Sequence, residues 1–475
     1  MKKIKSIFMV VLIFSLLIVM NHNLFAQVNK QDSLALVALY DSTDGANWTD
    51  NSNWLSGPVS TWFGVTVKNN RVTKLILRQN NLEGAIPAEI GDLVYLLQLN
   101  LSENQIAGLI PPEIGILTNL TLLNLGNNQL SDTIPSEIGN LMNLTECYLY
   151  GNQLSGAIPP EIGNLINLIN LNLSFNQLSS TIPPELGNLY NVQLITFGYN
   201  QLLGIIPPEL GNLKNLTELY LQNNQFSDSV PIEISSLTNL KKFYLGNNRL
   251  NDLPDLSIIN TLTDLVIRDN EFTFEDIEPN IDIPNFFYSP QDSVGIKQDT
   301  TINQNSSLTL SVSIGGKANQ FQWMKDEMEI PGADSSSYTI HSADSSDAGS
   351  YVCRITNTIA TQLILYCRPI HVTVDGITGV TEPSAQVPEV FALYQNYPNP
   401  FNPSTTIRFT MSKQQNVRLS VYNLLGQLVR TLIDEDMKEG WHSVVFNAAG
   451  FASGVYFYRI QTESFVSTKR FILLK

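Results

Sequence analysis

Apolar positions recur at a fixed interval through the first half of the chain. Between residues 72 and 270 the pattern L-x-x-L-x-L-x-x-N-x-L-x-x-x-I-P returns every 24 residues, with a last step of 22. In each copy two apolar residues flank a variable one, as Leu123 and Leu125 flank Asn124, which predicts a short strand with one buried face. One copy cannot bury its own leucines, so we expect the copies to stack around a shared core.

Asparagine and proline mark the turns of each copy. Proline has a fixed φ and no backbone donor, so the Ile-Pro pairs suit an extended return segment on the opposite side. The asparagine after each strand can bond backbone groups that the turn leaves unpaired, and we interpret this column as structural rather than ligand-binding. Its members are Asn80, Asn104, Asn128, Asn152, Asn176, Asn200, Asn224, Asn248 and Asn270.

These residues resemble leucine-rich repeats, about nine of them over residues 72–270, in the 24-residue I-P subclass of plant receptor ectodomains and bacterial surface proteins. The resemblance implies a solenoid with parallel strands on a concave face and irregular or 3-10 turns on the convex face. It also implies a protein, peptide or glycan ligand on the concave face.

The variable strand positions and their neighbours carry tyrosines and amides, which can both stack and hydrogen-bond. An alternative is that tyrosine simply suits an exposed strand. Cys147 stands at an inward position, where we expect a buried, inert thiol. The candidate ligand-binding residues are Asn100, Asn124, Tyr148, Tyr150, Asn172, Phe175, Tyr199, Tyr220 and Tyr244.

The segments on either side of the repeats predict a signal and two caps. In residues 1–26 a basic start precedes the apolar run Ile7–Met20, which is typical of a cleaved secretory signal rather than a membrane span. Residues 27–71 resemble the N-terminal cap of bacterial leucine-rich repeat proteins, with a helix over Ser33–Tyr40. We expect residues 271–293, rich in aromatics, to form a C-terminal cap. Three tryptophans either cover the first repeat or stack on carbohydrate: Trp48, Trp54 and Trp62.

Residues 294–375 change to a strand-like period. Trp323 and the stretch Asp347–Cys353 resemble an immunoglobulin-type sandwich, which implies a core role for Trp323 and a corner role for Tyr351. Val312 takes the place of the first-strand cysteine, so the usual cross-sheet disulfide cannot form. A bridge from Cys353 to Cys367 is the alternative, but we favour free thiols because neighbouring strands rarely meet disulfide geometry.

Residues 376–390 are predicted to be a linker. The tail, residues 391–475, alternates apolar and polar positions and carries the stretches Tyr397–Pro403, Val421–Gln427 and Ala452–Tyr458. These features predict a small antiparallel sandwich and resemble the C-terminal sorting domain of the bacterial type IX secretion system. The resemblance implies contact with that machinery and a protein that is secreted or attached to the bacterial outer surface, without a transmembrane anchor after signal removal.

The net charge and the lack of catalytic motifs narrow the classes of function that the sequence supports. A net charge of -16 makes nucleic acid an unsuitable partner. The histidines of the chain after residue 26 lie outside the repeats, and we find no metalloprotease, serine-hydrolase or phosphate-cradling motif, so no catalytic residue, metal or cofactor is expected. We expect a non-enzymatic binding protein for adhesion or recognition. The alternatives are a polysaccharide hydrolase or hydrolase inhibitor, and a passive surface-layer protein.

Part of the acidity is periodic, in a column that we interpret as a solvated rim, with calcium bridging as the alternative: Glu89, Glu113, Glu137, Glu161, Glu185, Glu209 and Glu233.

Overall fold

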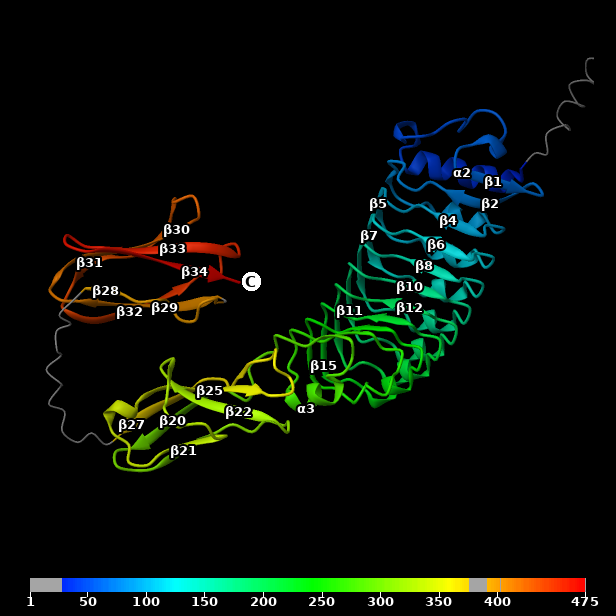
Figure 1. Cartoon of the computed structure of the whole chain (residues 1–475). Coiled ribbons are helices and arrows are strands. Elements are labelled where there is room, and N and C mark those ends of the chain that lie inside the picture. The colour runs from blue at the N-terminus through cyan, green and yellow to red at the C-terminus, as the bar shows by residue number, and fades with distance from the viewer. Residues whose placement is uncertain (1–27, 376–390, 402, 475) are drawn as a thin grey trace, which may run out of the picture. The chain divides into compact units, whose positions relative to one another are not determined.

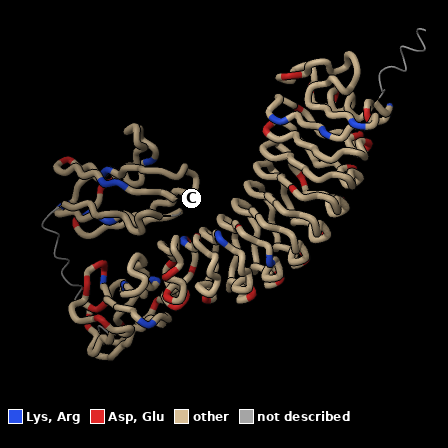
Figure 2. Tube along the Cα trace, turned by 45° about the vertical axis from the view of Figure 1, so that its right-hand side comes forward, with Lys and Arg blue, Asp and Glu red and all other residues tan. Residues whose placement is uncertain are grey.

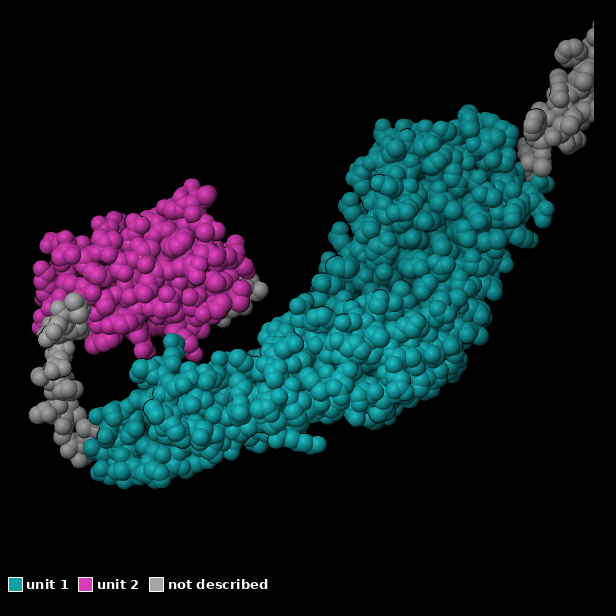
Figure 3. All heavy atoms as spheres, in the orientation of Figure 1, with its two compact units in different colours: residues 1–375 teal, residues 376–475 magenta. Residues whose placement is uncertain are grey.

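The computed structural model describes residues 28–375, 391–401 and 403–474 (Figure 1). The predicted signal, residues 1–26, and the predicted linker, residues 376–390, lie outside the described residues. The chain separates into two compact units, residues 1–375 and 376–475 (Figure 3). The first unit holds the repeat array and a middle sandwich, and the second holds a C-terminal sandwich.

The exposed side of an 11-stranded sheet forms the concave face of the repeat array (Figure 1). Each repeat contributes one short strand, because only its L-x-L segment alternates. Neighbouring strands are parallel and in register, apart from the antiparallel first pair. In order along the sheet the strands are β1 (Val65–Lys68), β2 (Arg71–Ile76), β4 (Gln98–Asn100), β6 (Leu122–Asn124), β8 (Glu146–Tyr148), β10 (Asn170–Asn172), β12 (Leu194–Thr196), β14 (Glu218–Tyr220), β16 (Lys242–Tyr244), β18 (Asp264–Val266) and β19 (Asn285–Phe287).

The segments that come directly after the periodic asparagines form a second parallel sheet, of eight strands. We did not predict it, because each strand has at most one buried residue, such as Leu130, and gives no run of alternation. The strands are β3 (Glu83–Gly84), β5 (Gln105–Gly108), β7 (Gln129–Thr133), β9 (Gln153–Gly156), β11 (Gln177–Ser180), β13 (Gln201–Gly204), β15 (Gln225–Ser229) and β17 (Arg249–Asp252).

Short 3-10 turns form the convex side, as the repeat pattern predicts. The first proline of each I-P segment is extended, as at Pro111 with φ −65°, and caps the turn that follows. The periodic glutamates of the acidic column lie on these turns. The turns are η3 (Ala88–Asp92), η4 (Pro112–Ile116), η5 (Ser136–Asn140), η6 (Pro160–Asn164), η7 (Pro184–Asn188), η8 (Pro208–Asn212) and η9 (Ile232–Ser236).

Glycine lets successive turns pack closely. A Cβ added to Gly187 in η7 would lie 2.5 Å from the backbone oxygen of Glu209 in η8. The same position in η9 is Ser235, and the following repeat, which is shorter, has no such turn among its described elements. A side chain is therefore tolerated only where the next turn is missing.

The asparagine ladder joins each repeat to its neighbours. Nδ2 of Asn128 donates to the backbone oxygens of Leu101 and Leu125 at 3.0 Å, and its Oδ1 accepts from the amide of Ile106 at 3.0 Å. Leu101 and Ile106 belong to the preceding repeat, so one side chain satisfies backbone groups of two repeats. Asn80, Asn104, Asn152, Asn176, Asn200, Asn224, Asn248 and Asn270 make comparable side-chain bonds to backbone groups.

The N-terminal end of the array is covered by helix α2 (Lys30–Ser42), turns η1 (Gly45–Asn47) and η2 (Val59–Thr61) and the antiparallel strand β1. Trp48, Trp54 and Trp62 are each 5–6% exposed and form a chain of ring contacts with Tyr40. These rings pack against the core, so stacking on carbohydrate, the alternative raised by the sequence, does not fit their positions.

A buried ion pair ties this cap to the first repeat. Asp32 of α2 is fully buried, binds the Arg71 guanidinium at 2.7 Å and accepts the Val72 amide at 2.7 Å. Arg71 and Val72 open β2, so the pair places the cap helix against the start of the sheet.

The C-terminal end of the array consists of α3 (Phe274–Ile277), η10 (Glu278–Asn280) and β19. Phe272 and Phe274 are fully buried, whereas Phe287 is exposed. The carboxylate of Glu278 accepts from the amide of Lys317 and from Nδ2 of Asn357, at 2.8 and 2.7 Å. Both partners belong to the middle sandwich, so this carboxylate joins the sandwich to the array.

The middle sandwich has a larger sheet, ordered β20-β27-β25-β22-β23 with β26 beside β25, and a pair, β21-β24. Trp323 is fully buried, and the Tyr351 hydroxyl donates to the backbone oxygen of Asp347 at 2.9 Å, a tyrosine corner. Its elements are β20 (Gln298–Asn303), β21 (Leu308–Ser311), β22 (Asn319–Lys325), β23 (Met328–Glu329), β24 (Ser337–Ile340), η11 (Ser345–Asp347), β25 (Gly349–Asn357), β26 (Leu365–Tyr366) and β27 (Ile370–Asp375).

The three cysteines are buried and free. Burial raises the pKa of Cys147 and of Cys353 to about 12, which keeps both thiols protonated at neutral pH. The Cys353 backbone amide donates to Sγ of Cys367 at 2.9 Å, so the Cys367 thiol lies against the Cys353 backbone.

The C-terminal unit is an antiparallel sandwich of two sheets, ordered β28-β29-β32 and β31-β30-β33-β34. Its core includes Phe409, Phe446, Tyr458 and Phe471. The strands are β28 (Ala392–Leu393), β29 (Ser404–Met411), β30 (Gln415–Tyr422), β31 (Leu428–Met437), β32 (Gly440–Asn447), β33 (Gly454–Gln461) and β34 (Val466–Leu473).

Candidate functional site

The concave face brings most of the candidate residues into neighbouring columns. The middle residue of each strand is buried, and the residues on both sides of it are half-buried, facing outward. Register places Asn124 beside Tyr148, Tyr148 beside Asn172, and Tyr220 beside Tyr244. Asn100 lies at the start of this column, beside Asn124.

The asparagines of this column are partly committed to the fold. Oδ1 of Asn100, Asn124 and Asn172 accepts the backbone amide two residues later, at 3.0 Å in each case. This local bond sets the turn that leaves the strand. Among the described residues their Nδ2 groups have no partner, so these side chains present donors to the concave face.

The tyrosines are held by carboxylates on the same strand. The Tyr148 hydroxyl donates to Oε2 of Glu146 at 2.9 Å, and the Tyr220 hydroxyl donates to Oε2 of Glu218 at 2.6 Å. Lys242 lies 3.2 Å from the other oxygen of Glu218. The Tyr220 and Tyr244 rings stack with centroids 4.8 Å apart. This part of the face therefore combines ring surfaces with charged hydrogen-bonding groups.

These contacts predict a stability loss at alkaline pH. Partial burial, followed by the Glu146 carboxylate, raises the pKa of Tyr148 to about 12 from 10.0. The unfolded chain thus releases the proton first, so the stabilisation is complete below pH 10 and is lost as pH rises toward 12. We expect the free energy of unfolding to fall less over this range in Tyr148→Phe than in the wild type. Urea titrations at several pH values measure this, and equal falls would contradict it.

Phe175 and Tyr199 form the most exposed aromatic pair of the face. They are 54% and 44% exposed, and their rings stack at 4.2 Å with 9° between the planes. Both precede a ladder asparagine, where the backbone is left-handed, with φ of 55° and 60°. This conformation costs an ordinary side chain about 1–2 kcal/mol. Other repeats use polar residues or glycine at this place: Gln79, Glu103, Asn127, Gly151, Asn223, Asn247 and Asp269.

Tyr150 differs from this pair because it rests on the preceding repeat. A Cβ added to Gly126 would lie 2.5 Å from the Tyr150 ring, so glycine makes room for it. Tyr150 is half-buried and fills the space beside a backbone segment. We therefore place it at the border of the face.

Sequence reasoning missed some polar groups beside the candidate residues. One of them is the ion pair that Arg78 and Glu103 form at 2.6 Å. The sequence does place Gln222 beside the variable strand positions, but it gives no sign that Oε1 of Gln222 is buried with no partner in the described part of the chain. The strain at Phe175 and Tyr199 could have been noticed earlier, because both stand where neighbouring repeats carry asparagine or glycine.

Charges are scattered over the repeat array (Figure 2). The lysines and arginines, blue in the figure, form no continuous stripe of the kind that tracks a phosphate backbone. Within the described ranges, no group of three or more His, Cys, Asp and Glu side chains is placed to hold a metal ion. None of the helices described there is long and apolar enough to span a membrane.

Comparison with known families matches most of the repeat array, much of the middle sandwich and the C-terminal unit. Residues 395–474 match the secretion system C-terminal sorting domain, and residues 293–357 match an immunoglobulin domain. The leucine-rich repeat matches residues 95–117, 119–141, 143–165 and 167–189, and its two-copy form matches residues 214–258. The chain is a leucine-rich repeat protein. It also carries an immunoglobulin-like domain and a type IX secretion sorting domain.

Solved structures agree with the repeat fold. The PEPR1–AtPEP1 crystal structure is 28% identical with a TM-score of 0.50, and covers 58% of this chain and 38% of that one. An Arabidopsis receptor kinase ectodomain, HAESA, in complex with an N-terminally extended IDA peptide hormone is 29% identical with a TM-score of 0.50, covering 57% of this chain and 46% of that one. The match thus spans less than half of either plant chain. No curated protein matches the sequence.

The sorting domain indicates export, so this leucine-rich repeat protein is secreted or attached to the bacterial outer surface. Repeat ectodomains of this fold usually bind ligands, and immunoglobulin-like domains are typically binding modules without catalysis. Together these features support a secreted binding protein.

Proposed function

We propose that this protein recognises an extended segment of a peptide or protein on the concave face of its repeats, without catalysis. The proposal covers the columns from Asn100 to Tyr244 together with the pair Phe175 and Tyr199. The sorting domain, residues 391–475, would present this face outside the cell through the type IX machinery. Adhesion or recognition is the role that follows.

The exposed pair Phe175 and Tyr199 carries the proposal. Neither ring fills the core, and each stands at a left-handed position that asparagine or glycine occupies with less strain. Strained residues that contribute little to packing point to function. Two stacked rings in neighbouring repeats offer a broad apolar contact of the kind that anchors a partner segment.

The surroundings of the pair favour a peptide or protein over a small apolar ligand. Tyr148 and Tyr220 present rings whose hydroxyls bind carboxylates, and Lys242 adds a positive charge near Glu218. Such a mixture of aromatic, donor and charged groups is typical of protein recognition surfaces. The similar plant ectodomain was solved with a peptide hormone bound, which supports the same class of ligand here.

An array of secreted proteins and peptides, probed with the purified full chain, tests the proposal. We expect a Phe175→Asn, Tyr199→Asn double variant to bind the captured ligand about tenfold or more weakly, because both ring contacts are lost. A tenfold change in the dissociation constant corresponds to about 1.4 kcal/mol of binding free energy. Its melting temperature should not fall, since asparagine relieves the left-handed strain.

A matched control replaces two exposed apolar residues away from the concave face, in Leu109→Asn and Ile205→Asn, which are 49% and 51% exposed in the wild type. This control should keep its affinity. Unchanged binding by the aromatic double variant, or a clear drop in its melting temperature, would argue against a ligand role for the pair.

A further inference from the structure

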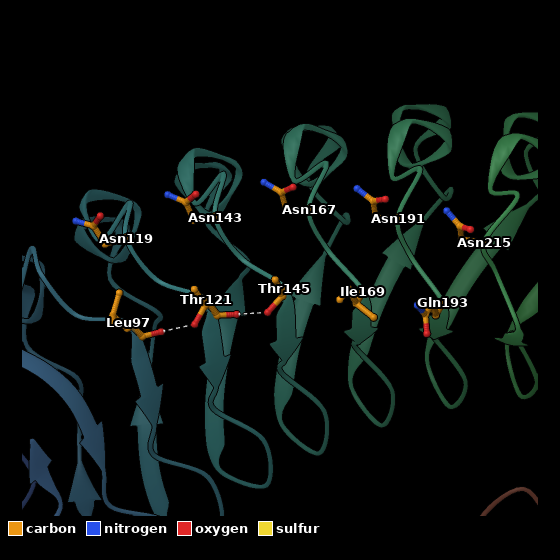
Figure 4. Close-up of a pocket in the computed structure, with 10 residues that line it drawn as sticks. All are labelled: Leu97, Asn119, Thr121, Asn143, Thr145, Asn167, Ile169, Asn191, Gln193 and Asn215. Atoms are coloured by element: carbon orange, nitrogen blue, oxygen red, sulfur yellow. Dashed lines mark hydrogen bonds between the residues drawn. The ribbon is translucent and has the colours of Figure 1, made fainter.

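A groove of about 800 Å³ runs along the edge of the 11-stranded sheet where its strands begin (Figure 4). It crosses successive repeats between the strands and the turns above them, and it contains none of the candidate residues of the concave face. One wall is a row of asparagines with the period of the repeat: Asn119, Asn143, Asn167, Asn191 and Asn215.

These asparagines are held in one orientation. Nδ2 of Asn119 donates to the backbone oxygen of Val94, and Nδ2 of Asn167 donates to that of Met142, both at 2.8 Å. Asn143, Asn191 and Asn215 repeat the bond. Because Nδ2 of each asparagine already donates to a backbone oxygen, the side chain cannot flip, and its Oδ1 faces outward as an acceptor. Among the described residues this Oδ1 has no partner. The wall is therefore a row of fixed acceptors, one in each repeat.

The opposite side of the groove mixes hydroxyl, amide and apolar groups. Oγ1 of Thr145 donates to the backbone oxygen of Thr121 at 2.9 Å, which leaves its lone pairs able to accept. Ile169 and Gln193 continue this row in the next repeats (Figure 4). Gln193 is exposed, so both a donor and an acceptor are available there.

The lining contains no charged residue, although the chain has a net charge of -16. An ionic ligand would find no counter-charge in the groove. Beside the asparagine row lies an exposed apolar border, in which Met142, Ile166 and Tyr190 are 61%, 51% and 56% exposed. A long uncharged groove with fixed polar groups and an apolar border fits a ligand that is polar, neutral and has apolar faces.

Spacing favours a polysaccharide over a peptide. Neighbouring parallel strands lie about 4.8 Å apart, so the groove offers one equivalent set of groups per such step. An extended peptide advances about 3.3 Å per residue and presents the same side every second residue, at about 6.6 Å, so its groups lose register within a few repeats. A β-1,4-linked sugar chain advances by one ring over slightly more than the strand spacing and turns over at each ring, so every second ring presents the same edge after about two strands. Its hydroxyls can donate to acceptors, while its ring faces are apolar.

We propose that this groove binds a neutral, β-linked polysaccharide at a site separate from the concave face. Ring hydroxyls donate to the Oδ1 row, and the ring faces contact the border at Ile166 and Tyr190. Export places the groove where extracellular polysaccharide is found. The observations that support this groove do not depend on the proposed peptide site.

Calorimetric titration of the full chain with cellohexaose, mannohexaose and xylohexaose tests the proposal, with a hyaluronan hexasaccharide as the charged β-linked comparison. We expect at least one neutral hexasaccharide to bind and the charged one not to bind. An Ile169→Arg, Gln193→Arg double variant fills the groove and should bind at least tenfold more weakly. Tyr190→Ala, which leaves the groove open, should also weaken binding.

The matched control puts the same changes on the second sheet and its loop, in Gln201→Arg and Ile205→Arg, and should bind as the wild type does. The Phe175→Asn, Tyr199→Asn variant should also keep its sugar affinity. The proposal is overturned if no neutral hexasaccharide binds, or if the groove variant, with an unchanged melting temperature, binds like the wild type. Loss of sugar binding in the Phe175→Asn, Tyr199→Asn variant would place the sugar on the concave face and overturn it as well.

Discussion

Replacing Asn128 by leucine is expected to lower the free energy of unfolding by about 3–5 kcal/mol. Asn128 is 9% exposed, and its amide bonds the backbone oxygens of Leu101 and Leu125 and the amide of Ile106. Leucine has a similar volume but no polar atom, so these buried groups lose their partner. Because Leu101 and Ile106 belong to the preceding repeat, the loss should weaken the interface between the repeats as well as the turn.

The chain offers a matched control in its other periodic asparagine row. Asn143 is exposed and makes one bond, from Nδ2 to the backbone oxygen of Thr118 at 2.8 Å. Asn143→Leu should cost no more than about 1 kcal/mol, since water can replace the lost bond. Urea unfolding of the two variants gives the comparison. Equal costs would mean that the ladder asparagines are ordinary turn residues.

The second large effect is expected for Gly187→Ala, at about 3 kcal/mol of lost stability. The new methyl group would lie 2.5 Å from the backbone oxygen and 2.8 Å from Cβ of Glu209. Both atoms belong to the next turn, so η7 and η8 would have to separate, and a backbone shift cannot be absorbed by a side-chain rotation. The strain should spread to the spacing of neighbouring strands.

Ser235→Ala is the matched control for this substitution, since Ser235 holds the same place in η9. It should cost about 1 kcal/mol or less, because what it removes is the hydrogen bond from Oγ of Ser235 to the backbone oxygen of Ile232 at 2.6 Å. Thermal unfolding of both variants measures the difference. A Gly187→Ala variant as stable as the wild type would show that the convex turns are not closely packed.

The repeat architecture could be predicted from the sequence because its determinants are local and periodic. Leu123 and Leu125 fix the strand, and Pro111 fixes the start of a convex turn. The second sheet was missed because its strands pair only between repeats and carry at most one buried residue each. In the sorting domain, alternation predicts strands around residues 406–409, 418–422, 442–446 and 455–460. It does not predict β31 and β34, since many of their residues are exposed or half-buried.

The candidate site was predictable as a face but not as a set of contacts. Alternation alone places Tyr148 and Tyr220 on the exposed side of the sheet. It does not show that their hydroxyls bind Glu146 and Glu218, because that depends on side-chain rotamers. The left-handed backbone at Phe175 comes from the turn that all repeats share. Its meaning appears only when the repeats are compared at that position.

The central claim is that the concave face of the repeats binds a peptide or protein. Hydrogen–deuterium exchange of the full chain, with and without the ligand identified in the screen of secreted proteins and peptides, tests this claim most directly. If the concave face binds the ligand, amides in and just after β8, β10, β12 and β14 should exchange more slowly in the complex, including those near Phe175 and Tyr199. The convex turns η5 to η8 should be unchanged. Protection confined to the convex turns, the middle sandwich or the sorting domain would contradict the claim.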